Sequence, residues 1–332
     1  LGIFYIKYLT YKMCYIIFPI INGYRKFMND LITDVKKLEI ETLKNLKNSK
    51  SNNTLRAYES DFRSFTLFCK NNGLNPLPTE PKVLSIYLTH LSKTCRFSTL
   101  KRRIASIKVV HKMKGHYLDS KHPIIMENLL GIKRVYGSHQ KAKKPILIND
   151  LKMLIKVIDE YETKDLLKIR NKSLILIGFS GGFRRSELVN IDYEDLEFVS
   201  EGLKIFIKKS KTDQSGEGHI KAIPYFKNSE YCPVINLKNW LNFKKIQKGK
   251  IFDISDKLVA LIIKKYISIA GLDPIKYGGH SLRSGFATSA AESGAEERNI
   301  MAMTGHKTTQ MVRRYIQEAN LFKNNALKNI KI

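Results

Sequence analysis

The sequence predicts a mainly α-helical protein with one small β-sheet, divided into a helical N-terminal domain and an α+β second domain. Three observations carry this prediction. Apolar residues recur at spacings of three and four along most of the chain, two short runs alternate as strands do, and a segment without apolar periodicity separates the halves. The 332 residues are enough for two domains at about 100–200 residues each.

The N-terminal half contains a polar helical segment over Leu31 to Lys50, followed by four amphipathic helices. Residues 51–54 supply N-cap candidates for the first of these helices, which ends at Gly73. The second covers Val83 to Leu91, the third opens at Ser98, and the fourth covers Ile124 to Val135. Residues 29–136 are therefore predicted to form a small helical bundle.

Residues 137–147 are predicted to be a basic linker, because they carry three lysines and Pro145 but no apolar periodicity. The second domain, residues 148–332, opens with a helix whose N-cap is Asn149 or Asp150. An apolar helix from Leu166 to Phe179 then breaks at two glycines. Two alternating runs, Leu203 to Ile207 and Ile220 to Pro224, predict a β-hairpin.

Helical patterns resume after the hairpin. They cover Leu258–Ile269, Ser281–Ser293, Glu296–Met303 and Thr308–Ile316. A tail helix with a narrow apolar stripe, from Ala319 to Ile330, closes the chain. So narrow a stripe favours docking onto another surface, either of its own domain or of a neighbouring subunit.

Residues 1–28 are predicted to be an upstream extension of the reading frame or disordered. Lys7, Lys12 and Pro19 interrupt the apolar run, so neither a membrane span nor a signal peptide fits well, although a membrane anchor stays as the alternative. The four cysteines are far apart and form no CxxC pair, which indicates a reduced cytoplasmic setting. No glycine-rich phosphate loop, HExxH or zinc-type cluster occurs, so no metal or cofactor is expected.

The charge is strongly positive: 58 Lys+Arg against 30 Asp+Glu gives +28. Such an excess favours a polyanionic partner, although the codon bias of an AT-rich genome is an alternative source. No acidic residue lies between Glu80 and Asp119, so the third helix is predicted to face phosphates. The DNA-binding candidates on this helix and in the linker are Lys101, Arg102, Arg103, Lys108, Lys112, Lys141, Lys143 and Lys144.

Three segments, residues 181–188, 279–285 and 304–309, combine basic and nucleophilic side chains with small turn residues. His280 and Arg283 are three apart in a predicted helix and point to one side. Guanidinium groups at the starts of two helices would clamp the oxygens of a phosphodiester. The hairpin residue Lys211 is a candidate proton donor for a leaving 5′-oxygen, and a tyrosine phenol can attack phosphorus without a metal. Singly, a Gly-His-Ser turn is often a helix cap, and a lone tyrosine is usually core or surface.

Together these segments resemble the tyrosine recombinase family, which includes the phage integrases and the Cre- and Xer-like recombinases. The resemblance covers Pro145 to Ile316, and the helical N-terminal half is similar to the family's core-binding domain. The Gly-x-Arg-x-Ser-Glu-Leu box selects Arg184 over Arg185, and a lysine before threonine selects Lys211 over Lys208 or Lys209. The remaining matches are Glu187 in the first box, His280 and Arg283 in the His-x-x-Arg box, His306 and the nucleophile Tyr315.

The resemblance implies a role for each residue. Arg184 and Arg283 hold the scissile phosphate, Lys211 protonates the leaving hydroxyl, and Tyr315 forms the covalent 3′-phosphotyrosine. The histidines, His280 and His306, hydrogen-bond the phosphate oxygens or assist proton transfer, and Glu187 orients its neighbours.

The resemblance also implies a site-specific recombinase that needs neither metal nor ATP and exchanges strands through a Holliday junction. Its partner is double-stranded DNA, on which synapsed sites assemble a homotetramer, whereas the free protein is a monomer or weak oligomer. No membrane is involved, and a nucleoid-associated protein encoded by a bacterium, phage or mobile element is expected. A type IB topoisomerase-like enzyme and a non-catalytic DNA-binding protein remain as alternatives.

Overall fold

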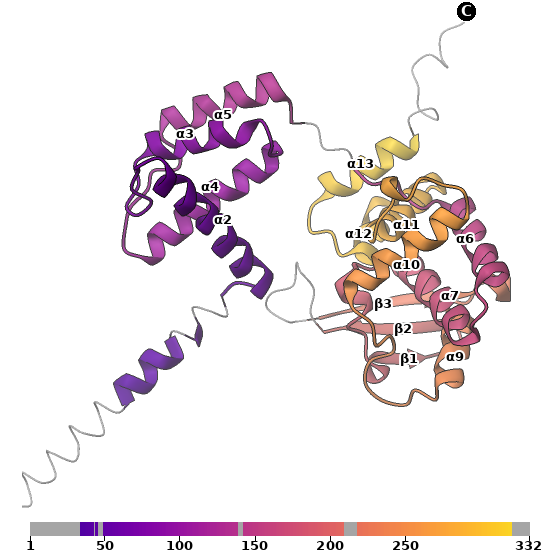
Figure 1. The fold of residues 1–332 in the computed structure, drawn as a ribbon. Helices are drawn as coiled ribbons and strands as arrows, with labels where there is room; N and C mark the ends of the chain where they lie inside the picture. Colours follow the sequence, from indigo (N-terminus) through magenta and orange to yellow (C-terminus); the bar gives the residue numbers. More distant parts are fainter. Residues whose placement is uncertain (1–33, 43, 46–48, 139–141, 209–217, 321–332) are drawn as a thin grey trace, which may run out of the picture. The chain divides into compact units, whose positions relative to one another are not determined.

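The structure, a computed structural model, describes residues 34–42, 44–45, 49–138, 142–208 and 218–320. The chain divides into two compact units, Leu1–Gln140 and Lys141–Ile332 (Figure 1). Each unit has its own hydrophobic core. The mainly α-helical prediction with one small sheet is confirmed.

The first unit is a helical bundle. Its helices are α2 (Asn52–Asn71), α3 (Pro81–Ser92), α4 (Phe97–Met113) and α5 (Pro123–Tyr136), in agreement with the four predicted helices. Ser51 is the N-cap of α2 and accepts a hydrogen bond from the backbone N–H of Thr54. Helices α2 and α4 pack together, as do α3 and α5, around buried side chains that include Phe65, Leu88 and Leu100. The preceding residues 34–42 and 44–45 are helical and exposed.

The second unit combines helices with a three-stranded antiparallel sheet in the order β1–β2–β3. The strands are β1 (Leu196–Phe198), β2 (Gly202–Ile207) and β3 (His219–Pro224), and Leu203 of β2 pairs with Ile223 of β3. The predicted hairpin is therefore confirmed. Strand β1 extends the hairpin by a third strand that the sequence did not indicate.

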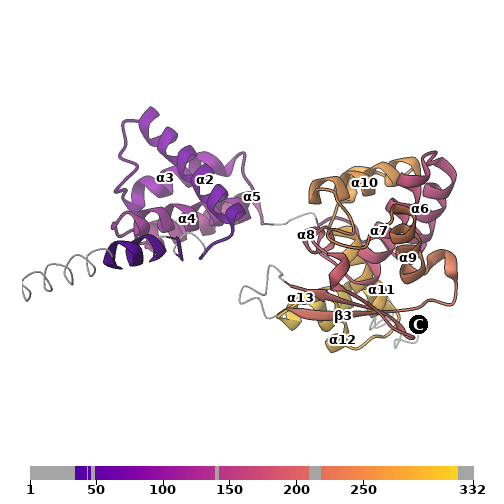
Figure 2. The ribbon, with the colours of Figure 1, turned by 90° about the horizontal axis from the view of Figure 1, so that it is seen from below.

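Eight α-helices are described in this unit. They are α6 (Ile148–Tyr161), α7 (Asp165–Ser180), α8 (Arg185–Leu188), α9 (Pro233–Lys244), α10 (Asp256–Ile269), α11 (Ser281–Glu292), α12 (Glu297–Thr304) and α13 (Thr309–Asn320). Three short 3₁₀ helices, Tyr193–Asp195, Ser229–Tyr231 and Pro274–Lys276, connect them. Figure 2 shows α7 in the middle of the unit, with α6, α9 and α11 packed around it. This central position explains its apolar sequence, since every residue from Ser173 to Ser180 is buried.

The start of α6 differs from the prediction. The helix begins at Ile148 with Leu147 as its N-cap, so neither Asn149 nor Asp150 occupies the cap. The Asp150 carboxylate instead accepts a hydrogen bond from the Leu147 backbone N–H from inside the first turn, 3.3 Å away. An acidic side chain at the third helical position can satisfy this orphan donor as well as a cap can, which is why the pattern was ambiguous.

The second half of the predicted linker packs onto the second unit. The backbone N–H groups of Lys144 and Ile146 donate to the carbonyls of Lys276 and Ser281, at 2.7 and 3.0 Å, and the Ile146 side chain is fully buried. The first residues of the chain, the hairpin tip and the tail helix after Asn320 lie outside the described residues. Predictions made for those segments stay predictions.

Substitution of Gly285 by alanine is expected to destabilise the second unit by about 3 kcal/mol, at the upper end of overpacking costs. A Cβ atom at Gly285 would lie 1.9 Å from the carbonyl oxygen of Ile146, and backbone cannot move aside cheaply. Trp240, the chain's single tryptophan, is buried in this unit, so its fluorescence during denaturant unfolding measures the loss. The control is Gly131→Ala in α5, where a Cβ meets nothing within 4 Å; it should leave the Trp240 transition unchanged.

Candidate active site

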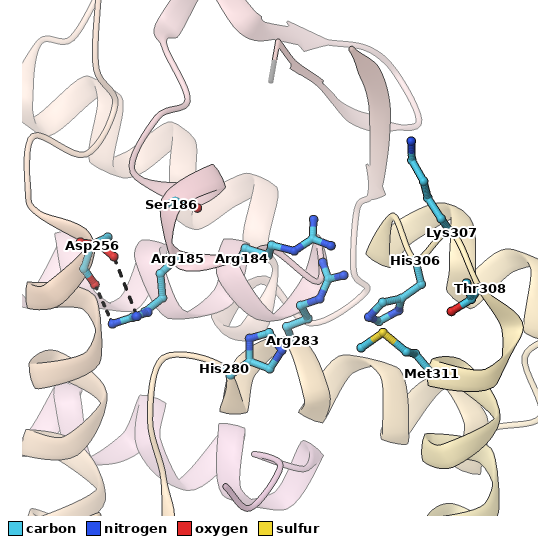
Figure 3. A pocket seen from close by; sticks show the side chains of 10 residues that line it. All are labelled: Arg184, Arg185, Ser186, Asp256, His280, Arg283, His306, Lys307, Thr308 and Met311. Carbon is cyan, nitrogen blue, oxygen red and sulfur yellow. Dashed lines mark hydrogen bonds and ion pairs between the residues drawn. The ribbon is translucent and has the colours of Figure 1, made fainter. Parts of the chain in front are cut away.

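A pocket of about 560 Å³ brings together residues from four separate segments of the second unit (Figure 3). They come from the starts of α8, α10 and α11 and from the turn that joins α12 to α13 together with the first turn of α13. The lining residues are Arg184, Arg185, Ser186, Asp256, His280, Arg283, His306, Lys307, Thr308 and Met311. The three chemistry-bearing segments singled out in the sequence therefore meet at one cavity.

Arg184 is the N-cap residue of α8, at the end of the tight turn that follows α7. Gly182 in this turn has φ +54°, a left-handed conformation that glycine adopts without strain. The Glu187 carboxylate accepts from the Arg184 backbone N–H at 2.9 Å and from its guanidinium at 2.5 Å. Burial opposes the charge of Glu187, but Lys221 and Arg184 outweigh it and lower the pKa of the carboxyl group. Glu187 thus holds Arg184 by both its backbone and its side chain.

Arg283 lies on α11 with only 1 % of its surface exposed. One terminal nitrogen donates to the Gly182 carbonyl at 2.9 Å, while its Nε and its other terminal nitrogen have no hydrogen-bond partner among the described residues. Burial and the neighbouring Arg184 lower its pKa to about 10, so the guanidinium stays charged at neutral pH. Figure 3 shows the guanidinium groups of Arg184 and Arg283 next to one another. Two adjacent cations, one of which has two donors without a partner among the described residues, form a site suited to an oxyanion.

Arg185 has a different environment from Arg184. Its guanidinium turns toward Asp256, which it approaches at 3.9 Å, and it also donates to the Asp256 backbone carbonyl at 3.4 Å (Figure 3). The geometry is consistent with the choice of Arg184 over Arg185 as the residue that faces Arg283.

His306 is 7 % exposed, and its Nδ1 lies 2.8 Å from the Thr304 hydroxyl. That hydroxyl donates its hydrogen to the Ile300 carbonyl at 2.6 Å, so it accepts the hydrogen carried by Nδ1 of His306. The assigned tautomer therefore leaves Nε2 as an acceptor. Burial, followed by the charges of Arg283 and Arg184, lowers the pKa of His306 to about 4.

His280 is the N-cap of α11 and lies at the exposed rim of the pocket. Partial burial of the ring, followed by the charges of Arg283 and Arg184, lowers the pKa of His280 as well. Both histidines are consequently neutral at physiological pH, and the positive charge of the pocket comes from its arginines and Lys307.

Tyr315 lies on α13, which packs against α11 and α12 of the same chain. Its partly buried ring contacts the small apolar cluster of Ala287, Ala291, Ile300 and Val312. The ring centroid is 6.1 Å from that of His306, with the planes inclined by 32°. The tyrosine is thus beside the pocket, next to a histidine that can accept a proton.

Lys211 lies outside the described residues, but the hairpin lysines Lys204, Lys208 and Lys221 are placed. Lys208, just after β2, contacts the carboxylates of Asp192 and Asp195 at 2.9 and 2.8 Å, and these bonds raise its pKa. It is therefore poorly suited to donate a proton. Lys221 on β3 is buried beside the site, and sequence reasoning missed it. The strand alternation carried the signal, because Lys221 shares its face with the buried Ile223.

The basic residues predicted to bind DNA differ in their surroundings. Lys101, Arg102, Lys108 and Lys112 are exposed on α4, although Arg102 also pairs with the buried Asp61 at 2.6 Å. The side chain of Arg103 is only 16 % exposed; it donates to the Ser64 hydroxyl at 2.8 Å and to Tyr87. Lys143 and Lys144 are exposed, Lys143 with its ammonium bound to the Ile275 carbonyl, and Lys141 is outside the described residues.

Lowering the pH from about 6.5 to about 4 is expected to destabilise the second unit through His306. The folded state keeps this histidine neutral down to about pH 4, whereas the unfolded chain protonates it near 6.5, so the unfolded state binds the additional proton in that window. Replacement of His306 by glutamine should reduce this pH-dependent loss in the free energy of unfolding by about 1–3 kcal/mol. Trp240-monitored unfolding at several pH values compares the two proteins, and equal slopes would contradict the assignment.

Within the described part of the chain, no helix is long and apolar enough to span a membrane. Among the same residues, no group of three or more His, Cys, Asp and Glu could hold a metal ion.

Comparison with known proteins gives matches over both units. Residues 146–321 match the phage integrase family, and residues 40–116 match the phage integrase N-terminal SAM-like domain. The chain is 39 % identical to an integrase/recombinase xerD homolog of Selenomonas ruminantium over 329 residues, 95 % of this chain and 96 % of the relative.

Solved structures share the fold. The Tn1549 transposon integrase in complex with transposon right end DNA superposes with a TM-score of 0.60 at 14 % identity, covering 85 % of this chain and 97 % of that one. The XerH site-specific recombinase bound to palindromic difH substrate gives 0.58 at 18 % identity, covering 75 % and 73 %.

Proposed function

The chain belongs to the phage integrase family, the tyrosine recombinases, and from this premise we propose that it cuts and rejoins duplex DNA through a covalent bond between Tyr315 and a 3′-phosphate. One observation carries the proposal at the level of residues. Two hydrogen-bond donors of the buried Arg283 have no partner among the described residues and lie beside Arg184, in a pocket that is lined by the neutral His306 and adjoined by Tyr315.

The Tyr315 phenol oxygen attacks the phosphorus, and the bond from phosphorus to the 5′-oxygen breaks. One phosphodiester bond replaces another, so the bond energy is retained for rejoining and ATP hydrolysis is not needed. Arg184 and Arg283 stabilise the charge that develops on the non-bridging oxygens. Glu187 keeps Arg184 in place.

Two protons move in this step. The neutral His306, with Nε2 as an acceptor, is suited to take the proton of the phenol, directly or through water. His280 at the rim hydrogen-bonds a phosphate oxygen. Lys211 protonates the leaving 5′-oxygen, a role carried over from the family because its loop lies outside the described residues.

Double-stranded DNA is the substrate on this proposal. The basic face of α4, with Lys101, Arg102, Lys108 and Lys112 exposed, supports contacts to the phosphate backbone, as do Lys143 and Lys144. The two solved structures described above, an integrase with transposon end DNA and a recombinase with its difH substrate, also support this assignment. The protein would act in the cytoplasm, on DNA of the nucleoid or of a mobile element.

The test is a nicked suicide duplex that carries the site footprinted by the protein in DNA flanking its gene. The nick lets the short 5′-hydroxyl fragment diffuse away, so that a covalent adduct accumulates. We expect an adduct in buffer containing EDTA, with the protein attached at Tyr315 in a peptide map. No adduct on a duplex that the protein demonstrably binds would refute the proposal.

We further propose that four copies assemble on two synapsed sites and exchange strands through a Holliday junction. Two differently labelled target duplexes should yield recombinant products and junction intermediates. Relaxation of supercoiled DNA by a monomer without such junctions would instead support the topoisomerase alternative, which the family matches do not favour.

A further inference from the structure

A lysine ammonium is buried next to the arginine pair. Lys221 points inward from β3 with 1 % of its surface exposed. Its Nζ donates to the Gly181 carbonyl at 2.7 Å and lies 4.3 Å from the centre of the Phe183 ring. Removing a charged ammonium from water is costly, so such a group is retained where it makes specific contacts.

Both contacts are to the turn between α7 and α8 that ends at Arg184. The next carbonyl of this turn, that of Gly182, accepts from Arg283. Two basic side chains, one from β3 and one from α11, therefore donate to two successive carbonyl groups. The turn is also closely packed, since a Cβ at Gly181 would lie 2.0 Å from the Phe183 ring.

We propose that Lys221 is a positioning residue for the phosphate clamp: by binding the Gly181 carbonyl and the Phe183 ring it fixes the turn, and thereby the direction of the Arg184 guanidinium. This inference rests on the proposed function, because it assigns Arg184 to the scissile phosphate. Lys221 itself does not line the pocket and touches no reacting atom.

The charges around Lys221 explain why its position matters. Burial lowers its pKa to about 7, Glu187 acts in the opposite direction, and Arg283 and Arg184 add to the lowering. Lys221 in turn lowers the pKa of Glu187, the carboxylate that holds Arg184 by two hydrogen bonds. Loss of Lys221 thus removes a hydrogen bond to the turn. It also removes a nearby positive charge that favours the ionised form of Glu187, the partner of Arg184.

The first experiment compares Lys221→Met with Lys204→Met on the suicide duplex at saturating protein. Lys204 is the matched control, because it lies on the neighbouring strand β2 and pairs with Glu197 at 3.0 Å, outside the pocket. We expect Lys221→Met to bind the duplex within about threefold of wild type and to cleave it about 10- to 100-fold more slowly, as for a misplaced catalytic group. The control should cleave within about threefold of wild type.

Lys221→Gln, which keeps an N–H donor without the charge, carries the test if Lys221→Met does not fold. If neither variant folds, Lys221 is needed for the core alone and the proposal is overturned. If the wild type cleaves and Lys221→Met cleaves at the same rate, the proposal is also overturned, and the proposed function stands. If the wild type itself forms no adduct, the proposed function fails first.

A double-mutant cycle shows whether Lys221 acts through Arg184. When Arg184 is already alanine, its position no longer matters, so adding Lys221→Met should slow cleavage by less than about threefold. If Lys221→Met acted through a general effect on folding, the double variant would instead lose the product of the two single-variant factors in cleavage rate. Multiplied losses would overturn the proposal.

The leaving group separates positioning from proton donation. A duplex with sulfur in place of the bridging 5′-oxygen releases a thiolate, which needs no proton from the protein. We expect this duplex to restore cleavage by Lys211→Ala and to leave the defect of Lys221→Met unchanged. Restoration of Lys221→Met to the wild-type rate would identify Lys221 as a proton donor and overturn the positioning role.

Discussion

Replacement of Tyr315 by phenylalanine is expected to abolish the covalent protein–DNA adduct while DNA affinity changes by less than about threefold. The substitution removes only the hydroxyl that forms the bond to phosphorus. The ring keeps its contacts with the apolar cluster between α11, α12 and α13, so the fold should be preserved. Denaturing electrophoresis of the suicide-duplex reaction measures the adduct, and a gel-shift titration measures binding.

Tyr193→Phe is the matched control for this experiment. Tyr193 is also partly buried against the core of the second unit, but it does not line the pocket. This control should form the adduct at the wild-type rate. An adduct of undiminished yield with Tyr315→Phe would remove Tyr315 from the role of nucleophile.

Replacement of Arg283 by alanine is expected to slow cleavage by at least about 10³-fold. Loss of a single oxyanion donor costs about 10²–10³ in rate, and Arg283 presents two N–H groups that have no partner among the described residues. The change also leaves the Gly182 carbonyl without its donor, which should cost about 1–3 kcal/mol of stability. Trp240 fluorescence measures that loss separately from the single-turnover cleavage rate.

Arg185→Ala provides the comparison for Arg283→Ala. Both changes remove one guanidinium from the lining of the same pocket, yet Arg185 is engaged with Asp256. We expect a loss of less than about tenfold for Arg185, in keeping with a partly exposed ion pair. Equal losses for Arg185 and Arg283 would show that the pocket contributes only its total charge.

The helices and the hairpin of this chain were predictable because the signals are local. The apolar periodicity of α2, α6 and α10 and the alternation of β2 and β3 follow from the burial of one face. The short strand β1 was missed, because three residues are too few to show a period. Helix α9, which begins at Pro233, was missed although it is longer. Its buried positions include the polar Asn236, which interrupts the apolar stripe.

The site was predictable in part for a different reason. Arg184, His280, Arg283 and His306 occur in short motifs whose order and spacing are visible in the sequence. The tautomer of His306 depends on Thr304, and the orientation of the Arg283 guanidinium depends on the Gly182 carbonyl; such pairings come only from tertiary structure. Lys221 is the clearest case, since its carbonyl partner is 40 residues away and belongs to another element.

The packing of α13 against α11 has a consequence for any assembly of several copies. One apolar cluster joins the helix that carries Tyr315 to the helix that carries Arg283 within a single chain. On the proposed mechanism, each copy brings its own nucleophile to its own clamp. In a mixture of two inactive variants, one lacking the tyrosine and one lacking the arginine, neither can repair the other, and the number of strands cut depends on how many copies are intact.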